Sequence, residues 1–497
     1  MRHRGCGVRA LLAVALLTAM SAWAETAAAQ TPGLPVVPIL GDPRGSTVAP
    51  FEGTTAIPNP VGGMTAPPLN PFMAPNGRSN IHNDAYMTDT YGGTGPLGAG
   101  PETSSLFLRE CGSVTFDSRG RIVTICVGLD RPVLALLDPH TLVTLAAMPL
   151  PVRNLTSGSN PFTDFSGGGY FYLDQQDRAV LPTNDRHLLE VAETAGPGFS
   201  VTRDYDLSGV VPAGDGIISA LPDWSGRFWF VTRQGIVGTV DRASGAIHAI
   251  TLPGEGISNS FAVDESGGVF VVSDHALYRF DAGSDGGPQV SWRQVYPNSG
   301  IHKPGQSDAG SGTTPTLMGT KWVTITDNAD PMDVVVYRRG RSVAGNRLVC
   351  SAPVFRQGAS STDQSLIATD HSIIAENNYG YSGVTATMNG GVTESGLSRV
   401  DVARGGCRTV WTSDERAPSV VPKLSLANGL VYTYTKPSRS DGIDAWYLTA
   451  LDFRSGRTVY RRLAGTGFGF NNNYAPVTLG PDGTAYVGVL GGLVEFP

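Results

Sequence analysis

The chain has 497 residues, of which 63 are glycine and 35 are proline, and only 16% of its residues carry a charge. This length is too great for one ordinary domain unless that domain is a barrel, a propeller or an array of repeats. The formal net charge of −7 argues against binding to nucleic acids or to an anionic membrane surface.

Residues 1–29 are expected to be a cleaved signal peptide. A basic stretch, MRHRGCGVR, precedes the apolar run ALLAVALLTAMSAWA, and the small residues of AETAAAQ follow. The apolar run is too short to span a bilayer comfortably, and its alanine-rich character is typical of a bacterial export signal. Cleavage could follow Ala24 or Ala29, and we favour Ala29. With no other candidate membrane span, we expect a soluble, monomeric protein that is secreted or periplasmic.

Residues 30–110 are predicted to form an extended lead-in. Stretches such as TPGLPVVPILGDPRGSTVAP are too rich in proline and glycine for regular helix or central strand. The segment SNIHNDAYMTDTY is denser in polar and aromatic residues than a free linker needs, so part of the lead-in is expected to drape over the following domain. In that case His82 could reach the centre of the domain, although a solvated or turn-forming role is the simpler interpretation.

From about residue 111 onward, pairs of short strands recur around turns of the type Asp-x-x-Gly. Examples are VTFDSRGRIVTIC, ISALPDWSGRFWFVT and FAVDESGGVFVVS. Alternation with a period of two, and turn residues roughly every eight to twelve positions, indicate an all-β fold. The units begin roughly 42 to 57 residues apart, which is the spacing of four-stranded propeller blades.

About eight units can be recognised, but the last one, ending in AYVGVLGGLVEFP, supplies only two or three strands. A propeller must close its ring or leave a sheet edge exposed. We therefore expect a segment of the lead-in to complete the last blade. The prediction for residues 111–497 is a β-propeller of eight four-stranded blades, with seven blades as the alternative.

Four cysteines remain after removal of the signal, and an even count in an exported chain suggests two disulfides. In CGSVTFDSRGRIVTIC, a two-residue loop would place residue 117 opposite residue 120 and, counting outward, Cys111 opposite Cys126. Opposed positions on antiparallel strands are close enough for a disulfide. Cys350 and Cys407 would then pair by elimination. Four buried free thiols are the alternative.

Two known groups of propellers resemble parts of this sequence. ALDFRSGRTVY and VDRASGAIHAI resemble blade halves of the quinoprotein-like superfamily, and SNSFAVDESGGVFVVSDHALYRFD is similar to a blade of the senescence-marker/gluconolactonase type. Dehydrogenases of the first group hold pyrroloquinoline quinone with a tryptophan-rich docking repeat and commonly an adjacent-cysteine disulfide. Neither feature occurs here, so this cofactor is not expected.

Propeller geometry predicts one polar channel mouth. In each blade the innermost strand runs from one rim of the channel to the other and the second strand returns, so the segments before the first strands and the loops after the second strands share a face. These segments include GISNSF, GSGTTP, TDNADP, AENNYGY and FGFNNNY. Ligand pockets in closed β-structures tend to lie at such mouths. The candidate ligand-binding residues are Asn259, Thr313, Thr314, Asn328, Asn377, Asn378, Tyr379, Asn473 and Tyr474.

Three interpretations of this mouth stay open. Amide groups could bind the hydroxyls of a small polar molecule while tyrosines stack on it. Carboxylate and amide oxygens also suit a hard cation such as Ca²⁺, and the gluconolactonase resemblance implies a metal held by Glu, Asn and Asp. The candidate ligands are Asp327, Asn328, Glu376 and Asn377, with Glu376 or Asp327 as the catalytic base of a metal-assisted reaction. Finally, such residues cap turns and satisfy the backbone at strand ends.

We rank a secreted or periplasmic propeller that binds a small hydroxylated ligand or a partner protein first. A Ca²⁺-dependent hydrolase or lactonase using the same mouth is the first alternative, and an assembly scaffold of the cell envelope is the second. No residue triad or metal motif of fixed spacing decides whether the protein is an enzyme.

Overall fold

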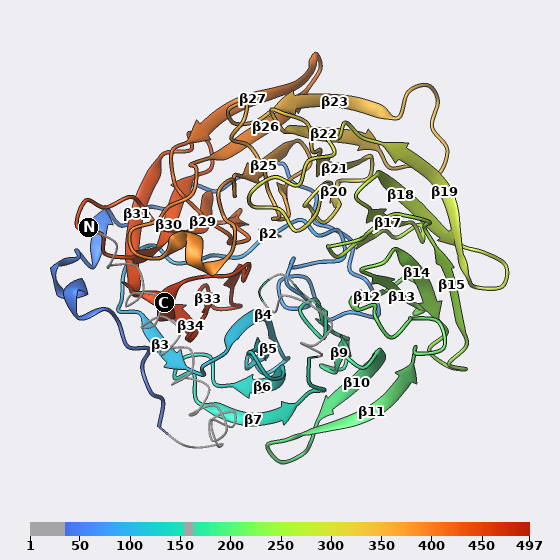
Figure 1. Cartoon of the computed structure of the whole chain (residues 1–497), viewed down its shortest axis with the longest axis horizontal. Coiled ribbons are helices and arrows are strands. Elements are labelled where there is room, and N and C mark those ends of the chain that lie inside the picture. Colours follow the sequence, from blue (N-terminus) through green and yellow to red (C-terminus); the bar gives the residue numbers. More distant parts are fainter. Residues whose placement is uncertain (1–34, 154–161, 163, 165) are drawn as a thin grey trace, which may run out of the picture.

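The computed structural model describes residues 35–153, 162, 164 and 166–497. The predicted signal peptide lies outside these residues. The described chain forms eight β-sheets arranged around a ring, seven of four strands and one of six, and each sheet contains the four antiparallel strands of one blade (Figure 1). The prediction of an all-β propeller with eight blades is therefore confirmed. No helix in the described ranges is long and apolar enough to span a membrane.

The blades are numbered along the chain, and each begins with its innermost strand. Blade 1 has β4 (Glu110–Phe116), β5 (Ile122–Val127), β6 (Val133–Leu137) and β7 (Thr144–Pro149). Blade 2 has β8 (Tyr172–Leu173), β9 (Ala179–Pro182), β10 (His187–Glu193) and β11 (Phe199–Asp206). Blade 3 has β12 (Ile217–Pro222), β13 (Phe228–Thr232), β14 (Ile236–Val240) and β15 (Ile247–Thr251). Blade 4 has β16 (Ala262–Val263), β17 (Val269–Val272), β18 (Ala276–Ala282) and β19 (Pro288–Val295).

Blade 5 has β20 (Thr316–Met318), β21 (Trp322–Thr326), β22 (Asp333–Arg338) and β23 (Leu348–Pro353). Blade 6 has β24 (Ile367–Ala368), β25 (Ser372–Glu376), β26 (Leu397–Ala403) and β27 (Gly406–Ser413). Blade 7 has β28 (Lys423–Ser425), β29 (Leu430–Thr435), β30 (Ala445–Asp452) and β31 (Thr458–Thr466). Blade 8 has β32 (Val477–Leu479), β33 (Ala485–Val489) and β34 (Gly492–Phe496). Short 3-10 helices occur at η1 (Pro43–Thr47), η3 (Val384–Thr387) and η4 (Phe468–Phe470).

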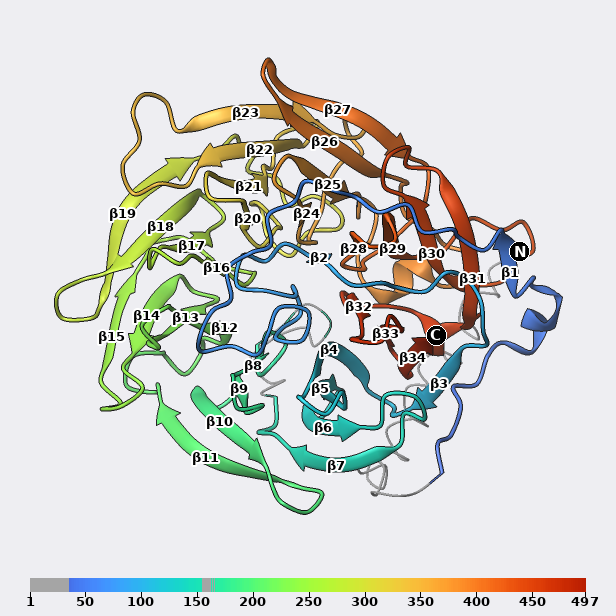
Figure 2. The ribbon, with the colours of Figure 1, turned by 180° about the vertical axis from the view of Figure 1, so that it is seen from behind.

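The lead-in supplies the strands that complete blades 7 and 8. Strand β3 (Thr103–Leu106) pairs antiparallel with β34, so the short last unit gains its fourth strand from the other end of the chain. This confirms that the ring closes with a lead-in segment. Strand β1 (Phe51–Gly53) adds an outer strand to blade 7, and β2 (Thr90–Tyr91) pairs with β28 on its inner side. Figure 2 shows the blue lead-in running from the outer edge of the ring across its centre.

The Asp-x-x-Gly sequences form the turns between the first and second strands. In blade 3 the carboxylate of Asp223 accepts backbone hydrogen bonds from Ser225, at 2.8 Å, and from Arg227, at 3.1 Å. Gly226 has a φ of +87°, a conformation that glycine adopts without a steric cost. The aspartate thus satisfies the turn backbone while the glycine reverses the chain, which is why this pattern recurs in the sequence.

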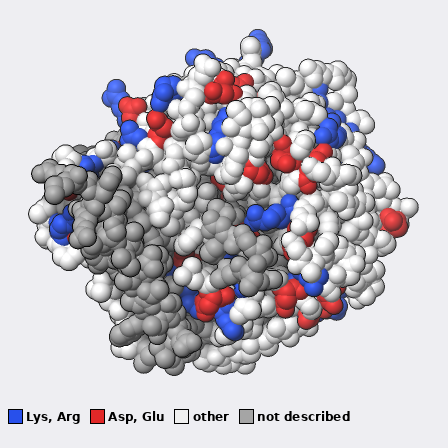
Figure 3. All heavy atoms as spheres, viewed as in Figure 1, with Lys and Arg blue, Asp and Glu red and all other residues white. Residues whose placement is uncertain are grey.

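Charged side chains of both signs are interspersed on the face seen in Figure 3. Among the described residues visible there, Lys and Arg lie close to Asp and Glu over most blades. A face of mixed charge has no strong attraction for a polyanion, because neighbouring opposite charges cancel at distances beyond the Debye length.

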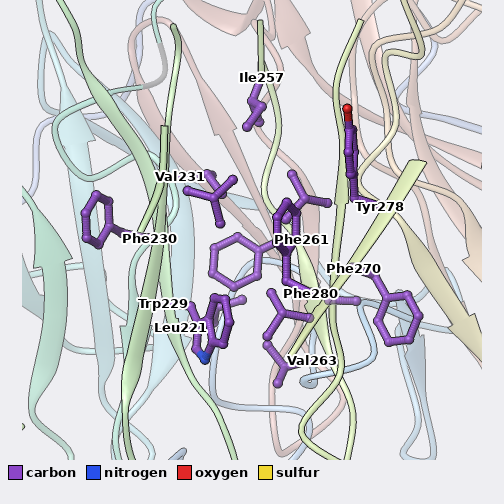
Figure 4. Close-up of a cluster of buried hydrophobic side chains, with 14 of the residues drawn as sticks. Leu221, Trp229, Phe230, Val231, Ile257, Phe261, Val263, Phe270, Tyr278 and Phe280 are labelled. Carbon is purple, nitrogen blue, oxygen red and sulfur yellow. The ribbon is translucent and has the colours of Figure 1, made fainter. Parts of the chain in front are cut away.

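The hydrophobic core lies between neighbouring blades. Figure 4 shows the contact between blades 3 and 4, where Trp229 of β13 faces Phe261 and Phe280, while Phe230, the next residue of β13, points to the opposite side. These four side chains have no exposed surface. Radial packing of large apolar groups of this kind repeats around the ring and holds the inner strands at fixed positions around the axis.

Both disulfides predicted from the sequence are present. Cys111 of β4 is bonded to Cys126 of β5 within blade 1, and Cys350 of β23 is bonded to Cys407 of β27. The second bridge joins the outer strands of blades 5 and 6. Two disulfides are consistent with an extracytoplasmic location, because such bonds persist in oxidising compartments.

Candidate functional site

One end of the ring axis is closed by residues 79–91 of the lead-in, which we call the plug. Every residue of the plug is buried. Its carbonyl groups accept hydrogen bonds of 2.8 to 3.0 Å from the inner strands of five blades, through the N–H groups of Leu173, Val263, Leu317, Ala368 and Leu424. These donors lie near the carboxyl ends of the inner strands. The plug therefore closes the axis on the side of the Asp-x-x-Gly turns.

The plug carries a buried chain of charged and polar groups. His82 places its Nδ1 atom 3.1 and 3.2 Å from the two carboxylate oxygens of Asp89. Asp89 also forms an ion pair with Lys423 of β28, and Lys423 donates to the carbonyl of Ile81 at 2.7 Å. The side chains of His82, Asp89 and Lys423 are at most 1% exposed. Burial lowers the pKa of Lys423, and Asp89 opposes this effect.

This arrangement fixes the orientation of the imidazole. The carboxylate of Asp89 accepts from Lys423, so the ring nitrogen that faces Asp89 has to act as a donor. In the neutral ring the proton then lies on Nδ1, and Nε2 is left as a hydrogen-bond acceptor. His82 therefore presents its acceptor atom to the side away from the ion pair.

Hydroxyl groups from five consecutive blades surround this acceptor, and we call them the hydroxyl collar: Tyr170, Ser219, Ser260, Thr314 and Ser365. The Oγ atoms of Ser365 and Thr314 lie 3.3 and 3.4 Å from His82 Nε2. The ring of Tyr170 stacks on the imidazole with 6.0 Å between centroids. The Oγ atoms of Ser219 and Ser260 are 2.8 Å apart. A cavity with room for about one water molecule is lined by His82, Tyr170, Ser219 and Ser260.

The repeat explains why these hydroxyls converge. Tyr170, Ser260, Thr314 and Ser365 each stand two residues before the inner strand of their blade, and Ser219 lies within β12. Equivalent positions in successive blades are related by rotation about the ring axis, so side chains at these positions point toward the same centre. A hydroxyl residue repeated at one blade position thus produces a ring of hydroxyls.

Three of the predicted ligand-binding residues lie at or beside the collar. Asn259 accepts a hydrogen bond of 3.0 Å from the phenol of Tyr170. Thr314 is a collar member. Thr313 faces away from it, because its hydroxyl contacts Ser311 and accepts the backbone N–H of Thr326 at 3.2 Å. The sequence prediction therefore named one member of the collar and two of its neighbours, and the collar as a binding site stays a prediction.

The run AENNYGY at residues 375–381 ties neighbouring loops together. The amide of Asn377 donates to the carbonyls of Ala359, at 3.0 Å, and Ser395, at 3.1 Å. Its oxygen accepts from the backbone N–H groups of Ser361, at 3.3 Å, and Tyr379, at 3.2 Å. The full hydrogen-bonding capacity of this amide is thus used by backbone groups on both sides of β25.

Asn378 and Glu376 extend the same network into blade 7. Asn378 Oδ1 accepts from the hydroxyl of Thr362 at 2.9 Å, and its amide donates to Glu376 at 2.9 Å and to the carbonyl of Pro418 at 3.2 Å. Glu376 also accepts from Thr433 at 3.2 Å. Burial raises the pKa of Glu376 well above its usual value. The number of amides at the end of β25 is explained by the number of loops that meet there.

The predicted residues Asn473 and Tyr474 meet the same run from blade 8. The phenol of Tyr381 donates to Asn473 Oδ1 at 2.8 Å, and the rings of Tyr381 and Tyr474 meet edge to face at 5.5 Å. The backbone N–H of Asn473 donates to Glu110 at 2.7 Å, and burial raises the pKa of Glu110 well above its usual value. Tyr379, the remaining aromatic candidate, is half-buried.

The candidate metal ligands are only partly engaged in protein contacts. Asp327 accepts from the N–H groups of Ala329, at 3.1 Å, and Asp333, at 2.8 Å, and burial raises its pKa to about 7. The amide N–H of Asn328 donates to Asn298 at 2.9 Å, while Asn328 Oδ1 and Asp327 Oδ2 have no hydrogen-bond partner among the described residues. Across the described ranges, no group of three or more His, Cys, Asp or Glu residues could hold a metal ion.

The oxygens of Asn377 and Glu376 are engaged in the loop network, so these two residues would have to give up protein hydrogen bonds to hold a cation such as Ca²⁺. The metal site stays a prediction. The catalytic roles of Glu376 and Asp327 were inferred from that metal, and they stay predictions.

Asp363 is an acidic group close to the collar. One of its oxygens accepts from the hydroxyl of Ser307, and the other, Oδ1, is buried and has no hydrogen-bond partner among the described residues. Burial raises the pKa of Asp363 to about 7. Its charge also raises the pKa of Tyr170 and of Tyr474, although burial is the larger cause in both. Asp363 therefore lies near both the collar and the aromatic pair of Tyr381 and Tyr474.

Several of the site residues were not singled out from the sequence: Asp89, Tyr170, Ser219, Ser260, Ser365 and Lys423. Lys423 carried a usable signal, because it interrupts the apolar run VVPKLSL at the start of an inner strand. A buried lysine needs a partner. The segment SNIHNDAYMTDTY, which is dense in polar residues, carried a second signal. It contains Asp89, the carboxylate that pairs with Lys423.

No family model matches this chain. An uncharacterized protein of Archaeoglobus fulgidus is 29% identical over 322 residues, which cover 58% of this chain and 62% of that protein. The matched part thus spans less than two thirds of that relative. The structure is similar to BamB from Moraxella catarrhalis, with 14% identity, a TM-score of 0.43, and coverage of 64% of this chain and 93% of the other. It is also similar to a streptogramin B lyase, with 10% identity, a TM-score of 0.39, and coverage of 77% and 92%.

Proposed function

We propose that the protein is a secreted or periplasmic propeller that binds a small, hydroxyl-rich ligand at the hydroxyl collar. The observation that carries this proposal is the closure of the ring axis by the plug, which brings the acceptor nitrogen of His82 to the centre of five hydroxyl-bearing positions. Ligand sites in closed β-structures tend to lie near the axis, and the one-water cavity beside His82 has to widen to admit a small ligand.

The chemistry of the collar matches hydroxyl groups. Each serine, threonine or tyrosine hydroxyl can donate one hydrogen bond and accept others, and His82 Nε2 accepts. A ligand with several hydroxyls can satisfy such a set in both directions. A ligand without them would leave buried polar groups unpaired, which costs about 1–3 kcal/mol for each group.

Calorimetric titration of the mature protein with a panel of monosaccharides and polyols tests this proposal. We expect at least one member of the panel to bind, and the variants Tyr170→Phe and Thr314→Val to weaken its binding by about tenfold or more. The matched control is Thr324→Val in β21, whose buried hydroxyl donates to the carbonyl of Val335 at 3.0 Å, away from the collar. This variant should keep the affinity of the unaltered protein.

Two results would overturn the proposal. One is that no sugar or polyol binds at millimolar concentration. The other is that a binding member of the panel keeps its affinity in both collar variants. The Ca²⁺-dependent hydrolase suggested by the sequence has less support, because two of its four candidate ligands, Asn377 and Glu376, already use their side-chain oxygens in the loop network.

A further inference from the structure

We propose that Ser365, His82 and Asp89 form a nucleophile, a general base and a positioning residue for acyl transfer, and that the substrate is a small ester of a hydroxyl-rich alcohol. This inference rests on the proposed function, because the same collar would bind the alcohol part of the ester. The three residues come from two distant parts of the chain, and they meet only because the plug is inserted in the ring.

The geometry follows the order that nucleophilic catalysis requires. Ser365 Oγ lies 3.3 Å from His82 Nε2, and Asp89 holds the opposite ring nitrogen at 3.1 Å. The acceptor atom of the base, His82 Nε2, therefore faces the hydroxyl of Ser365, and its donor atom, Nδ1, faces the carboxylate of Asp89. A distance slightly longer than an ideal hydrogen bond between nucleophile and base is usual without substrate.

Lys423 makes the buried carboxylate possible. An isolated ionised carboxylate inside a protein is strongly disfavoured, and the ion pair with Lys423 compensates Asp89. Lys423 also donates to the carbonyl of Ile81, the residue before His82 in the chain. One side chain of blade 7 thus fixes both the carboxylate and the backbone that carries the base.

The reaction can be written with its protons and electrons balanced. Ser365 Oγ attacks the ester carbonyl carbon while its proton passes to His82 Nε2. The bond between that carbon and the alcohol oxygen breaks, and the same proton passes from Nε2 to the departing alcohol. Water then attacks the acyl-serine with His82 again as the base, and the carboxylic acid and free Ser365 are released.

Thr314 provides a second hydroxyl beside the nucleophile. Its Oγ1 atom lies 3.4 Å from the same Nε2 atom, on the neighbouring blade. A hydroxyl in this position can donate to the carbonyl oxygen as negative charge develops there. The exposed fractions of Ser365 and His82 are 4% and 1%, and the cavity beside His82 has room for about one water molecule, so a substrate reaches these residues only when the surrounding side chains move, and a small acyl group requires the least movement. We therefore expect acetyl esters to be better substrates than long-chain esters.

The first experiment combines a fluorophosphonate probe with hydrolysis of p-nitrophenyl acetate, both applied to the mature protein. We expect one probe adduct by intact mass, mapped by peptide sequencing to Ser365, and measurable ester hydrolysis. Ser365→Ala should abolish both. Ser398→Ala is the matched control, because Ser398 of β26 is a buried serine of the same blade whose hydroxyl contacts Thr412, 3.0 Å away, and lies outside the collar; this variant should keep the adduct. No adduct on the unaltered protein, or an adduct that persists in Ser365→Ala, would overturn the inference.

The second experiment tests the positioning role of Asp89 by ¹⁵N NMR of the His82 ring. The unaltered protein should show the proton on Nδ1 at neutral pH. Asp89→Asn should move it to Nε2 and lower ester hydrolysis by about 100-fold or more, since the base then has no free acceptor atom. If Asp89→Asn does not fold, the double variant Asp89→Asn, Lys423→Met removes both charges and gives the same readout. An unchanged tautomer together with unchanged hydrolysis would contradict the role.

The two proposals fail in different ways. A protein that binds sugars or polyols but is never labelled at Ser365 would overturn acyl transfer and support the binding function. A protein that is labelled at Ser365 but binds no member of the panel would support acyl transfer and overturn the proposed alcohol part of the substrate.

Discussion

Cys111 lies directly opposite Cys126 because two register shifts cancel. The turn after β4 pairs Asp117 with Arg121, through a 3.0 Å hydrogen bond from the Asp117 N–H, so its loop is one residue longer than the sequence suggested. A β-bulge between Cys111 and Ser113 moves the register back by one residue. The disulfide was predicted correctly, although the assumed turn length was wrong and the bulge was not foreseen.

Removal of the bridge between blades 5 and 6 should destabilise the protein more than removal of the bridge within blade 1. The two bridges close loops of 57 and 15 residues. In the chain-entropy model these loops correspond to about 4 and about 3 kcal/mol. The double variants Cys350→Ala, Cys407→Ala and Cys111→Ala, Cys126→Ala can be compared by urea unfolding. The prediction is contradicted if neither pair lowers the unfolding midpoint.

The fold was accessible from the sequence because each blade repeats the same local chemistry. The Asp-x-x-Gly turns and the alternating strands are local features, and Asp223 with Gly226 shows how directly they determine the turn. The missing fourth strand of blade 8 could be inferred from the need to close the ring. The identity of that strand could not, since the pairing of Thr103 with Glu495 joins the two ends of the chain.

The site was only partly accessible, for a physical reason. Blade periodicity brings Asn259 and Thr314 to the axis, and this part of the prediction needed only the repeat. The group at the centre comes from outside the repeat, because the plug inserts His82 and Asp89 between the blades. The path of a proline- and glycine-rich segment over a ring is set by many weak tertiary contacts, and no local pattern encodes it.

Asn377→Ala should destabilise the protein, and Tyr379→Ala should have a much smaller effect. Asn377 makes four hydrogen bonds to backbone groups of three segments, and its removal leaves buried N–H and carbonyl groups without partners. We expect a loss of about 2–4 kcal/mol. The half-buried Tyr379 serves as the neighbouring control, for which a change below about 1 kcal/mol is expected. Equal losses in urea unfolding would show that the amide network is not what stabilises this loop.

Lys423→Met should cost more stability than the double variant Lys423→Met, Asp89→Asn. The single change leaves the carboxylate of Asp89 buried without its cation, which typically costs about 3–5 kcal/mol. The double change removes both charges. Arg439→Met is a control, because Arg439 pairs with the partly exposed Asp441 and should contribute less than about 1 kcal/mol. A double variant that is no more stable than Lys423→Met would contradict the assignment of the cost to the unpaired carboxylate.

Asp363→Asn should flatten the dependence of stability on pH between about 5 and 8. Burial raises the pKa of Asp363 from 3.8 to about 7 in the folded protein. Between these values the folded state binds more protons than the unfolded state, so stability is lost as pH rises through this window, by up to about 4 kcal/mol for a shift of this size.

An asparagine does not ionise, and the variant should therefore show a smaller fall in melting temperature from pH 5 to pH 8. Asp241→Asn is the control, because the hydroxyl and backbone of Ser244 lower the pKa of Asp241 and place its titration below this window. Identical melting curves for the unaltered protein and Asp363→Asn at both pH values would mean that Asp363 is already ionised in the folded state at pH 5.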